Sequence, residues 1–441
     1  MSSFTSLDGD VHPDQQKSSA PFPLVFVSAH FPPATIAGIP RIRALIRYLP
    51  EDGFSLNVIT VDDGSTLTEQ LNARQILRLP YKDLRPDKSP IASKQSVPMW
   101  RRIIRDVVAL PDRYVYWSKH AAQTAWGMAR KYRCPIFVSV PPVSSAWALA
   151  RYRRPGDPPL IVDFRDAWIT DPNRADYYRN PLRQYFEHRM EELTIRQSAT
   201  CFMASPGMLR SFQQRFPDYQ QRFHLFLNGY DEAAWDQLPT LNSLTKDQFH
   251  ILYSGSFPGY QTPEYVFRAL SELSDPNIHL HILGDNTGKA DSLIRTTYPQ
   301  LTNQVSIYSR QEYAQCLARQ QLADALLLIV TPGQSTDDTN MILTSKVFEY
   351  LRSGRPILAT IPTEGDADRL LSRFSWVKRT SPTNVGEIKD ALINAKDEWQ
   401  TKAIICPEDY QNHITDLRRD VQIHNVAMQL QQFYSQPAKV A

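Results

Sequence analysis

The chain has 441 residues and a formal net charge of +3, so its basic and acidic residues nearly balance. This balance gives no argument for a nucleic-acid partner. One hydrophobic core rarely extends over so long a chain, and we expect two domains of about two hundred residues each. The four cysteines are scattered without metal-ligand spacing, which argues against a disulfide scaffold and favours a reducing, cytoplasmic compartment.

The N-terminal segment, residues 1–20, is polar and has no apolar signal core, so we expect a disordered tail. No apolar run approaches the roughly twenty residues that a membrane-spanning helix needs. Residues 98–117 mix arginines with tryptophan and isoleucine. A packed helix with a charged outer face is the favoured interpretation. The alternative is a peripheral contact with anionic lipid head groups at the inner face of the membrane.

Apolar runs of strand length alternate with helical patterns over residues 21–240. The first strand is followed by a glycine loop, a helix and a second strand, which is the β-α-β opening of a parallel sheet. Strands are predicted at Leu24–Val27, Leu56–Val61, Pro135–Val140, Leu160–Asp163, Thr200–Ala204 and Phe223–Leu227, with helices at Val115–Tyr132 and Leu182–Ser198.

The polar stretch Asp236–Gln248 predicts a linker, after which the alternation restarts over residues 241–405. The last residues, 406–441, contain a helical stretch, Glu408–Tyr434, that we expect to pack back on the first domain. The predicted fold is therefore α/β, with two tandem Rossmann-like domains facing a cleft. In the second domain, strands are predicted at His250–Tyr253, His279–Leu283, Val305–Tyr308, Ala325–Val330 and Ile357–Ile361, and helices at Pro263–Leu273 and Gln311–Gln321.

The segment SKVFEYLRSGRPILA, residues 345–359, predicts a short helix, a glycine stop and a buried strand. Thr344 or Ser345 is expected to cap the first turn. Lys346 in that turn opposes the helix dipole unless an anion also binds there, which indicates a diphosphate site. Glu349, one turn later, could accept hydrogen bonds from sugar hydroxyls. A surface helix with one exposed ion pair remains the alternative.

Several polar residues follow the strands of the first domain. In the segment VDFRDAW, Asp163 and Asp166 flank Arg165 directly after a strand. One carboxylate could pair with the arginine while the other acts as a general base, although a purely structural ion-pair network is equally consistent. Other candidates are the glycine-loop residues Gly38 and Arg41, Ser139 in the segment SVPPVSS, and His30. His30 could act as a base, although a lone histidine more often has a structural role.

Two glycine-containing strand ends in the second domain predict phosphate-contacting turns. Ser254, Gly255 and Ser256 follow its first strand, and Gly284 follows its second. The lysine and spacing of a Walker loop are absent. Ordinary turns are the alternative for both segments.

Four segments together resemble glycosyltransferase family 4. They are FPPATIAGIPRIRALIRYL; the run containing Pro111, Asp112, Trp117 and Ala121; SVPPVSS followed by VDFRDAW; and SKVFEYLRSGRPILA. The resemblance implies the GT-B architecture, with a nucleotide-diphosphate sugar as co-substrate in the second domain and an acceptor in the first. It implies a role in making bacterial polysaccharides or in glycosylating other small acceptors.

This sequence departs from the family's pattern at two places. The donor motif usually has two glutamates separated by seven residues; Glu349 matches the second, but Met341 stands at the first. Many members carry an arginine and a lysine after the first strand of the second domain, where this chain has YSGSFPGYQTPE. Lys346 is the obvious substitute for that missing charge.

We therefore expect a retaining, metal-independent glycosyltransferase of the hexosyltransferase type, acting on a glycan, lipid-linked or small-molecule acceptor. The alternative is a catalytically silent protein of the same fold that binds a glycan, a nucleotide sugar or a partner enzyme. The expected roles divide the candidates into three groups: catalytic, Asp166 and His30; donor-binding, Gly38, Ser254, Gly255, Ser256, Gly284, Ser345, Lys346 and Glu349; acceptor-side, Arg41, Ser139, Asp163 and Arg165.

Overall fold

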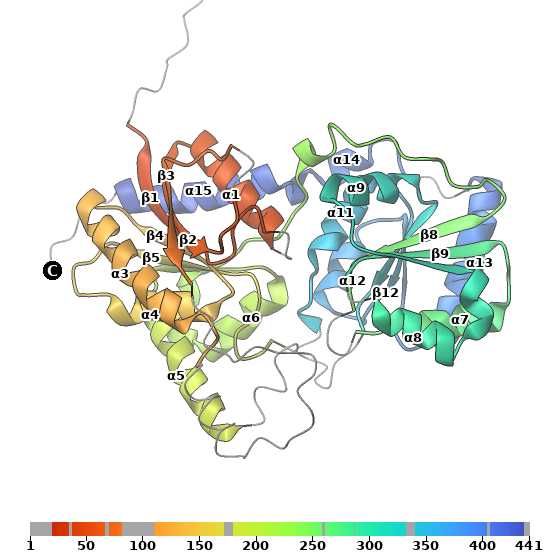
Figure 1. Ribbon diagram of the computed structural model, residues 1–441, viewed down its shortest axis with the longest axis horizontal. Coiled ribbons are helices and arrows are strands. Elements are labelled where there is room, and N and C mark those ends of the chain that lie inside the picture. The colour runs from red at the N-terminus through yellow and green to blue at the C-terminus, as the bar shows by residue number, and fades with distance from the viewer. Residues whose placement is uncertain are drawn as a thin grey trace, which may run out of the picture.

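The structure is a computed structural model that describes residues 20–34, 38–66, 70–81, 110–171, 180–257, 261–285, 287–331, 340–403 and 406–435. Figure 1 shows two layered α/β domains side by side, each with helices around its own sheet. Within the described residues, no helix is both long and apolar enough to cross a membrane.

The N-terminal domain is built on seven parallel strands in the order β3-β2-β1-β4-β5-β6-β7. The central strands are buried along their whole length because helices cover both faces of the sheet. The strands are β1 (Phe22–Val27), β2 (Phe54–Asp62), β3 (Gln75–Pro80), β4 (Ile136–Val140), β5 (Leu160–Phe164), β6 (Thr200–Met203) and β7 (Phe223–Leu225).

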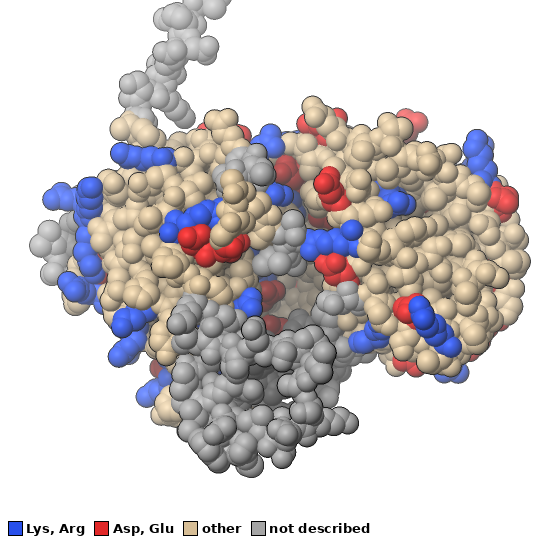
Figure 2. Space-filling model, viewed as in Figure 1, with Lys and Arg blue, Asp and Glu red and all other residues tan. Residues whose placement is uncertain are grey.

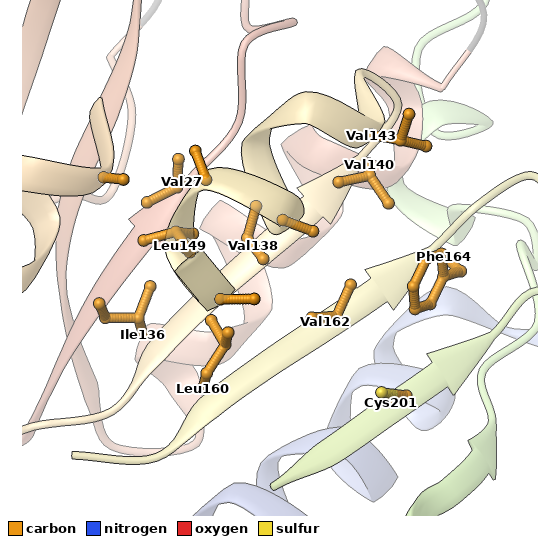
Figure 3. Close-up of a cluster of buried hydrophobic side chains, with 14 of the residues drawn as sticks. Val27, Ile136, Val138, Val140, Val143, Leu149, Leu160, Val162, Phe164 and Cys201 are labelled. Carbon is orange, nitrogen blue, oxygen red and sulfur yellow. The ribbon is translucent and has the colours of Figure 1, made fainter. Parts of the chain in front are cut away.

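Aliphatic side chains fill the layer between this sheet and its helices. Figure 3 shows Val138 of β4 and Val162 of β5 beside Leu149 of α4, all fully or almost fully buried. The helices of the domain are α1 (Ile39–Glu51), α3 (Val115–Tyr132), α4 (Val143–Tyr152), α5 (Pro181–Gln197) and α6 (Pro206–Arg215).

The C-terminal domain has six parallel strands in the order β10-β9-β8-β11-β12-β13, the doubly wound arrangement of nucleotide-binding folds. The strands are β8 (Phe249–Ser254), β9 (Ile278–Leu283), β10 (Val305–Tyr308), β11 (Ala325–Ile329), β12 (Ile357–Thr360) and β13 (Val377–Thr380). The helices are α7 (Glu264–Leu273), α8 (Gly288–Thr296), α9 (Tyr313–Leu322), α11 (Ser345–Ser353), α12 (Asp366–Leu371) and α13 (Val385–Thr401).

The chain crosses between the domains twice, and the two crossings lie together. Tyr230 of the first crossing pairs with Arg418 of the second in an isolated parallel bridge. Beyond it, α15 (Arg419–Ser435) returns to the N-terminal domain (Figure 1). There Ile423, Val426 and Leu430 enter the same buried cluster as α1.

The predicted α/β fold with two Rossmann-like parallel sheets is confirmed. The C-terminal stretch predicted as one helix, Glu408–Tyr434, is instead a short helix α14 (Tyr410–His413), a 3-10 turn at Thr415–Leu417 and then α15. The amphipathic prediction for residues 98–117 lies mostly outside the described residues. Within the described part, Trp117 belongs to α3 and is buried in the core.

Candidate functional site

A cavity of about 280 Å³ lies between the domains. Lysine, arginine, aspartate and glutamate side chains border the furrow between the domains on the face in Figure 2. The cavity wall combines strand ends of the N-terminal domain with the segment that leads into α11 and the first residue of α15. Its lining includes Gly38, Arg41, Pro141, Arg165, Asp166, Thr170, Ser205, Met208, Asn228, Met341, Leu343, Thr344, Ser345 and Arg419.

Two helix N-termini reach this cavity without a capping side chain. Gly38 precedes α1 with φ of 90°, and Thr344 precedes α11; neither makes a side-chain cap hydrogen bond, and neither helix has an acidic residue in its first turn. The predicted cap at Thr344 is therefore wrong, since its buried Oγ1 has no hydrogen-bond partner. Uncapped helix N-termini present free N–H groups and a positive dipole end, which together favour an anion.

Arg41 and Asp163 form a buried pair beneath the cavity. The Arg41 Nη2 lies 2.6 Å from Asp163 Oδ1, and the Ser139 hydroxyl donates to Asp163 Oδ2 at 2.7 Å. Arg41 also donates to the carbonyls of Phe226 and Leu227, both at 2.9 Å. Asp163 and Ser139 are fully buried and do not line the cavity. They therefore hold Arg41 from inside the domain. The sequence had assigned both residues to the acceptor side, but neither faces the cavity.

Arg165 and Asp166 lie on the cavity wall at the end of β5. Arg165 donates to the carbonyls of Val140 at 3.2 Å and Pro141 at 2.7 Å. The expected ion pair of Arg165 with one of the two flanking carboxylates is not formed. Asp166 has no hydrogen bond or ion pair within the described residues. Its carboxylate is exposed to the cavity. The surrounding protein nevertheless withdraws enough bulk water to raise the pKa of Asp166, with the positive charge of Arg165 acting in the opposite direction.

Buried contacts position the loop that carries Asp166. Glu187 of α5, which is fully buried, accepts from Trp168 Nε1 at 2.9 Å and from Arg183 Nε at 2.8 Å. Arg183 in turn donates to the carbonyl of Pro111 at 2.8 Å. The sequence segments around Pro111 and Trp168, which are far apart along the chain, thus meet in one buried network. This network fixes residues 165–168, directly after β5, against the domain.

Asp112 and His30 lie outside the cavity. Asp112 accepts from the backbone N–H of Ser144 at 2.9 Å and so caps the start of α4. His30 Nε2 lies 3.3 Å from the Tyr114 hydroxyl, and its pKa is lowered to about 4 by burial and then by the charges of Arg165 and Arg113. His30 is therefore neutral at neutral pH. It does not line the cavity that Asp166 lines.

In the C-terminal domain, Lys346 lies against the turn after β8. Its Nζ donates to the Tyr253 hydroxyl at 3.1 Å and lies 4.2 Å from the centre of that ring. A Cβ added at Gly255 would lie 2.4 Å from Lys346 Nζ, and one at Gly284 would lie 2.2 Å from the Gly255 carbonyl oxygen. The backbone contact makes glycine necessary at Gly284, and at Gly255 the φ of 148°, which other residues rarely adopt, does so. The structure brings the lysine and both glycine turns together.

The serines on either side of Gly255 are partly buried, and the backbone of each makes a hydrogen bond. The N–H of Ser254 donates to the Tyr350 hydroxyl at 2.8 Å, and the carbonyl of Ser256 accepts from the Tyr253 hydroxyl at 2.9 Å. These bonds fix the backbone of the turn. Ser345, by contrast, lies on the cavity wall at the start of α11.

Glu349 does not line the cavity and accepts a hydrogen bond from the Tyr313 hydroxyl at 2.9 Å. Burial raises the pKa of Glu349, and the positive charge of Arg419 is the largest influence in the opposite direction. Arg419, only 3% exposed, donates through Nε to the carbonyl of Asn228 at 3.1 Å and lines the cavity. One arginine of the C-terminal helix thus connects the cavity with the Tyr313–Glu349 pair.

A second set of contacts joins the two domains beside the cavity. Asp366, at the start of α12, accepts from the N–H of Gly207 at 2.5 Å and from Arg210 Nη2 at 2.9 Å, both in α6. The Ser205 hydroxyl donates to the carbonyl of Met341 at 2.8 Å. Met341 therefore occupies the interface between the domains, on the wall of the cavity.

Sequence reasoning missed Arg419 and Asp366. Arg419 lies in a stretch that the sequence predicts only as a helix, and the signal that could have found it is a basic residue at the start of the helix that returns to the N-terminal domain. Asp366 lies in no motif. Among the described residues, no group of three His, Cys, Asp or Glu side chains is arranged to hold a metal ion.

No protein-family model and no curated protein matches this sequence. Solved structures of similar fold span almost the whole chain. Sucrose-phosphate synthase from Thermosynechococcus elongatus aligns with a TM-score of 0.67 at 13% identity, covering 94% of this chain and 99% of its own. HepE from Anabaena in complex with UDP-glucose aligns with a TM-score of 0.62 at 14% identity, covering 93% and 99%.

WaaG, a glycosyltransferase involved in lipopolysaccharide biosynthesis, aligns with a TM-score of 0.60 at 15% identity, covering 92% of this chain and 99% of its own. Likeness at such low identity concerns the fold alone. The chain thus has the two-domain GT-B fold, and the fold does not separate family 4 from other families that share it.

Proposed function

We propose that this protein is a glycosyltransferase that moves a sugar from a nucleoside-diphosphate donor to an acceptor hydroxyl bound in the N-terminal domain. The observation that carries this proposal is the pair of uncapped helix N-termini, of α1 and α11, that meet at one interdomain cavity. Each can bind a phosphate through free N–H groups. The fold shared with a UDP-glucose complex of HepE supports a nucleotide-sugar ligand.

In this proposal the C-terminal domain holds the donor. Lys346, beside Gly255 and Gly284, supplies positive charge and close backbone approach to the phosphates. Glu349 accepts from a ribose or hexose hydroxyl, and Tyr313 orients its carboxylate. Because these groups and the helix dipoles can offset the charge of the leaving diphosphate, the reaction is proposed to be independent of a metal ion.

The transfer step breaks the bond between the sugar C1 and the diphosphate oxygen, and that bond's electrons stay with the diphosphate. A new bond forms from the acceptor oxygen to C1, and the acceptor proton passes to the Asp166 carboxylate. A raised pKa suits Asp166 to this role, because a carboxylate with a higher pKa is a stronger base. Retention of configuration, and an acceptor that is a glycan or is lipid-linked, are proposed from the family resemblance alone.

A second candidate function is a catalytically silent protein that binds a glycan or nucleotide sugar. Met341 favours it, because this side chain lies on the cavity wall where the resembling family carries a glutamate. An apolar thioether there cannot accept hydrogen bonds from sugar hydroxyls as a carboxylate does. A silent protein that binds a nucleotide sugar differs from the enzyme in turnover and not in donor binding, whereas one that binds only a glycan also lacks donor binding.

The donor site is tested by calorimetry with a panel of nucleoside-diphosphate sugars, beginning with UDP-glucose. Wild-type protein should bind at least one donor. Lys346→Ala should bind it at least tenfold more weakly, since a hydrogen bond to a charged group contributes about 1.5–3 kcal/mol. Lys389→Ala, which removes a partly exposed lysine paired with Glu272, is the matched control and should bind like wild type. Equal affinity of all three proteins would refute the proposed donor site.

A further inference from the structure

The donor diphosphate requires more positive charge than Lys346 supplies. At neutral pH a nucleoside diphosphate leaving group carries more than one negative charge, and burying it uncompensated in a cleft is costly. The segment after β8, YSGSFPGYQTPE, contains neither arginine nor lysine. The cavity wall, in contrast, contains three arginines from three elements: Arg41, Arg165 and Arg419.

Arg41 does not contribute to this compensation. Its guanidinium is paired with the buried carboxylate of Asp163, and its other donors are used by the carbonyls of Phe226 and Leu227. Arg165 and Arg419 form no salt bridge within the described residues, although both are more than nine-tenths buried. They are therefore the two cations of the wall whose charge is not neutralised by direct contact with a carboxylate.

We propose that Arg165 and Arg419 bind the leaving diphosphate and supply the charge that the turn after β8 lacks. This inference rests on the proposed function and adds two phosphate-binding residues to it. Neither lies in the C-terminal sheet domain that holds the rest of the donor. The diphosphate site is accordingly shared between the end of β5, the start of α15 and the N-termini of α1 and α11.

The geometry of Arg165 supports this role. Its Nε and Nη2 are used by the carbonyls of Val140 and Pro141, which hold the guanidinium plane in place. The remaining Nη1 is buried and has no hydrogen-bond partner. A Cβ added at Gly38 would lie 2.6 Å from this Nη1, so the unpaired nitrogen lies beside the residue that precedes α1. A buried donor without a partner destabilises the protein, and a bound phosphate oxygen would satisfy it.

Arg419 connects the same cavity to the donor side. Its Nε is held by the carbonyl of Asn228 and its charge acts on Glu349, the proposed hydroxyl-binding residue. An arginine between Glu349 and the cavity is placed to reach a phosphate that follows a bound ribose. For this reason we assign the phosphoryl group to the donor. A phosphate carried by the acceptor is the alternative source of the same chemistry.

The experiment measures binding of inorganic pyrophosphate, UDP, uridine and glucose 6-phosphate by calorimetry. The proteins are wild type, Arg165→Gln, Arg165→Lys, Arg419→Gln and the control Arg268→Gln. Arg268 is 61% exposed and pairs with Glu272 on the far helix α7. We expect each cavity glutamine variant to bind pyrophosphate and UDP at least tenfold more weakly and to leave uridine affinity unchanged. Arg165→Lys should fall between, because lysine keeps the charge and loses the planar donor.

Uridine affinity on each preparation verifies that the variant is folded, and far-ultraviolet circular dichroism does so for any variant that does not bind uridine. The inference is overturned if folded Arg165→Gln and Arg419→Gln bind pyrophosphate and UDP as wild type does. It is also overturned if both variants lose glucose 6-phosphate while UDP binding is intact, since the site would then belong to the acceptor. If wild type binds pyrophosphate through these arginines but no nucleotide, the proposed donor and the diphosphate assignment both fail and only an anion site remains.

Discussion

Replacing Asp163 by asparagine should destabilise the protein strongly, whereas the same replacement at Asp166, three positions later, should leave its stability nearly unchanged. Asp163 is fully buried against Arg41, which is 2% exposed, while Asp166 faces the cavity without a partner in the described part of the chain. Asp163→Asn leaves the guanidinium buried beside a neutral amide. Asp166→Asn removes a charge that the folded state disfavours, because the pKa of Asp166 is raised.

Breaking a buried pair by removing one charge costs about 3–5 kcal/mol. The lower end applies here, because Arg41 keeps the carbonyls of Phe226 and Leu227 and asparagine keeps one acceptor oxygen. For a domain of this size, 1 kcal/mol shifts the melting temperature by about 2–4 °C, which predicts a loss of about 6–12 °C for Asp163→Asn. Asp166→Asn should lie within about 0.5 kcal/mol of wild type, as surface substitutions usually do.

Thermal and urea unfolding of the three proteins, followed by circular dichroism at neutral pH, give these differences. The slope of the unfolding free energy against urea concentration should be the same for all three proteins if only native-state interactions change. An Asp163→Asn variant that is as stable as wild type would show that the buried pair does not hold Arg41. An Asp166→Asn variant that loses several kcal/mol would show that Asp166 is a structural residue and not a free carboxylate.

Three further predictions concern the domain interface, the donor and pH. Asp366→Ala removes the hydrogen bonds from Gly207 and Arg210 and should favour an open arrangement of the two domains. The radius of gyration of this variant, measured by small-angle X-ray scattering, should therefore exceed that of wild type. An identical value contradicts the interface role of Asp366. Glu349→Ala should weaken donor binding more than Glu349→Gln, which keeps one acceptor oxygen; equal wild-type turnover of both variants would leave Glu349 without a role in the reaction. Burial, and then the charges of His279 and His250, lower the pKa of His281 to about 3. Below about pH 6.5 the unfolded state therefore binds more protons than the folded state. The free energy of unfolding consequently falls as the pH drops towards 3. Between pH 7 and pH 5 this loss is about 2 kcal/mol in urea unfolding, and it should be smaller in His281→Gln; the same loss in both proteins would contradict the assignment to His281.

The sequence predicted the fold well where strands are buried on both faces. The runs that became β4, β5 and β11 are apolar throughout, and this pattern survives any arrangement of the surrounding helices. Of the four edge strands, β7 and β10 were predicted, whereas β3 and β13 were not. Their sequences, QILRLP and VKRT, mix charged and apolar residues because one side of each strand lies at the sheet's edge, and such short mixed runs resemble loops.

The candidate site was predicted only in part because side-chain pairing over long sequence separations leaves no local pattern. Lys346, at a helix start, and Gly255, at a strand end, were both assigned to the donor, and the structure places them close together. The partner of Asp163 on β5, however, is Arg41 on helix α1 and not Arg165, two residues further along the chain. Arg419 enters the cavity because α15 returns to the N-terminal domain, which depends on tertiary packing rather than on local sequence.

The central claim, that this fold transfers a sugar from a nucleotide donor, is tested most directly by the release of nucleoside diphosphate. Purified wild-type protein, Asp166→Asn and Lys346→Ala are incubated with the donor that calorimetry identifies, and the released diphosphate is measured over time with and without candidate acceptors. The account predicts release by wild type that acceptor accelerates, a strong loss of that acceleration in Asp166→Asn with donor affinity nearly intact, and weak donor binding in Lys346→Ala. Donor binding by wild type without any release would contradict catalysis and identify a silent nucleotide-sugar-binding protein.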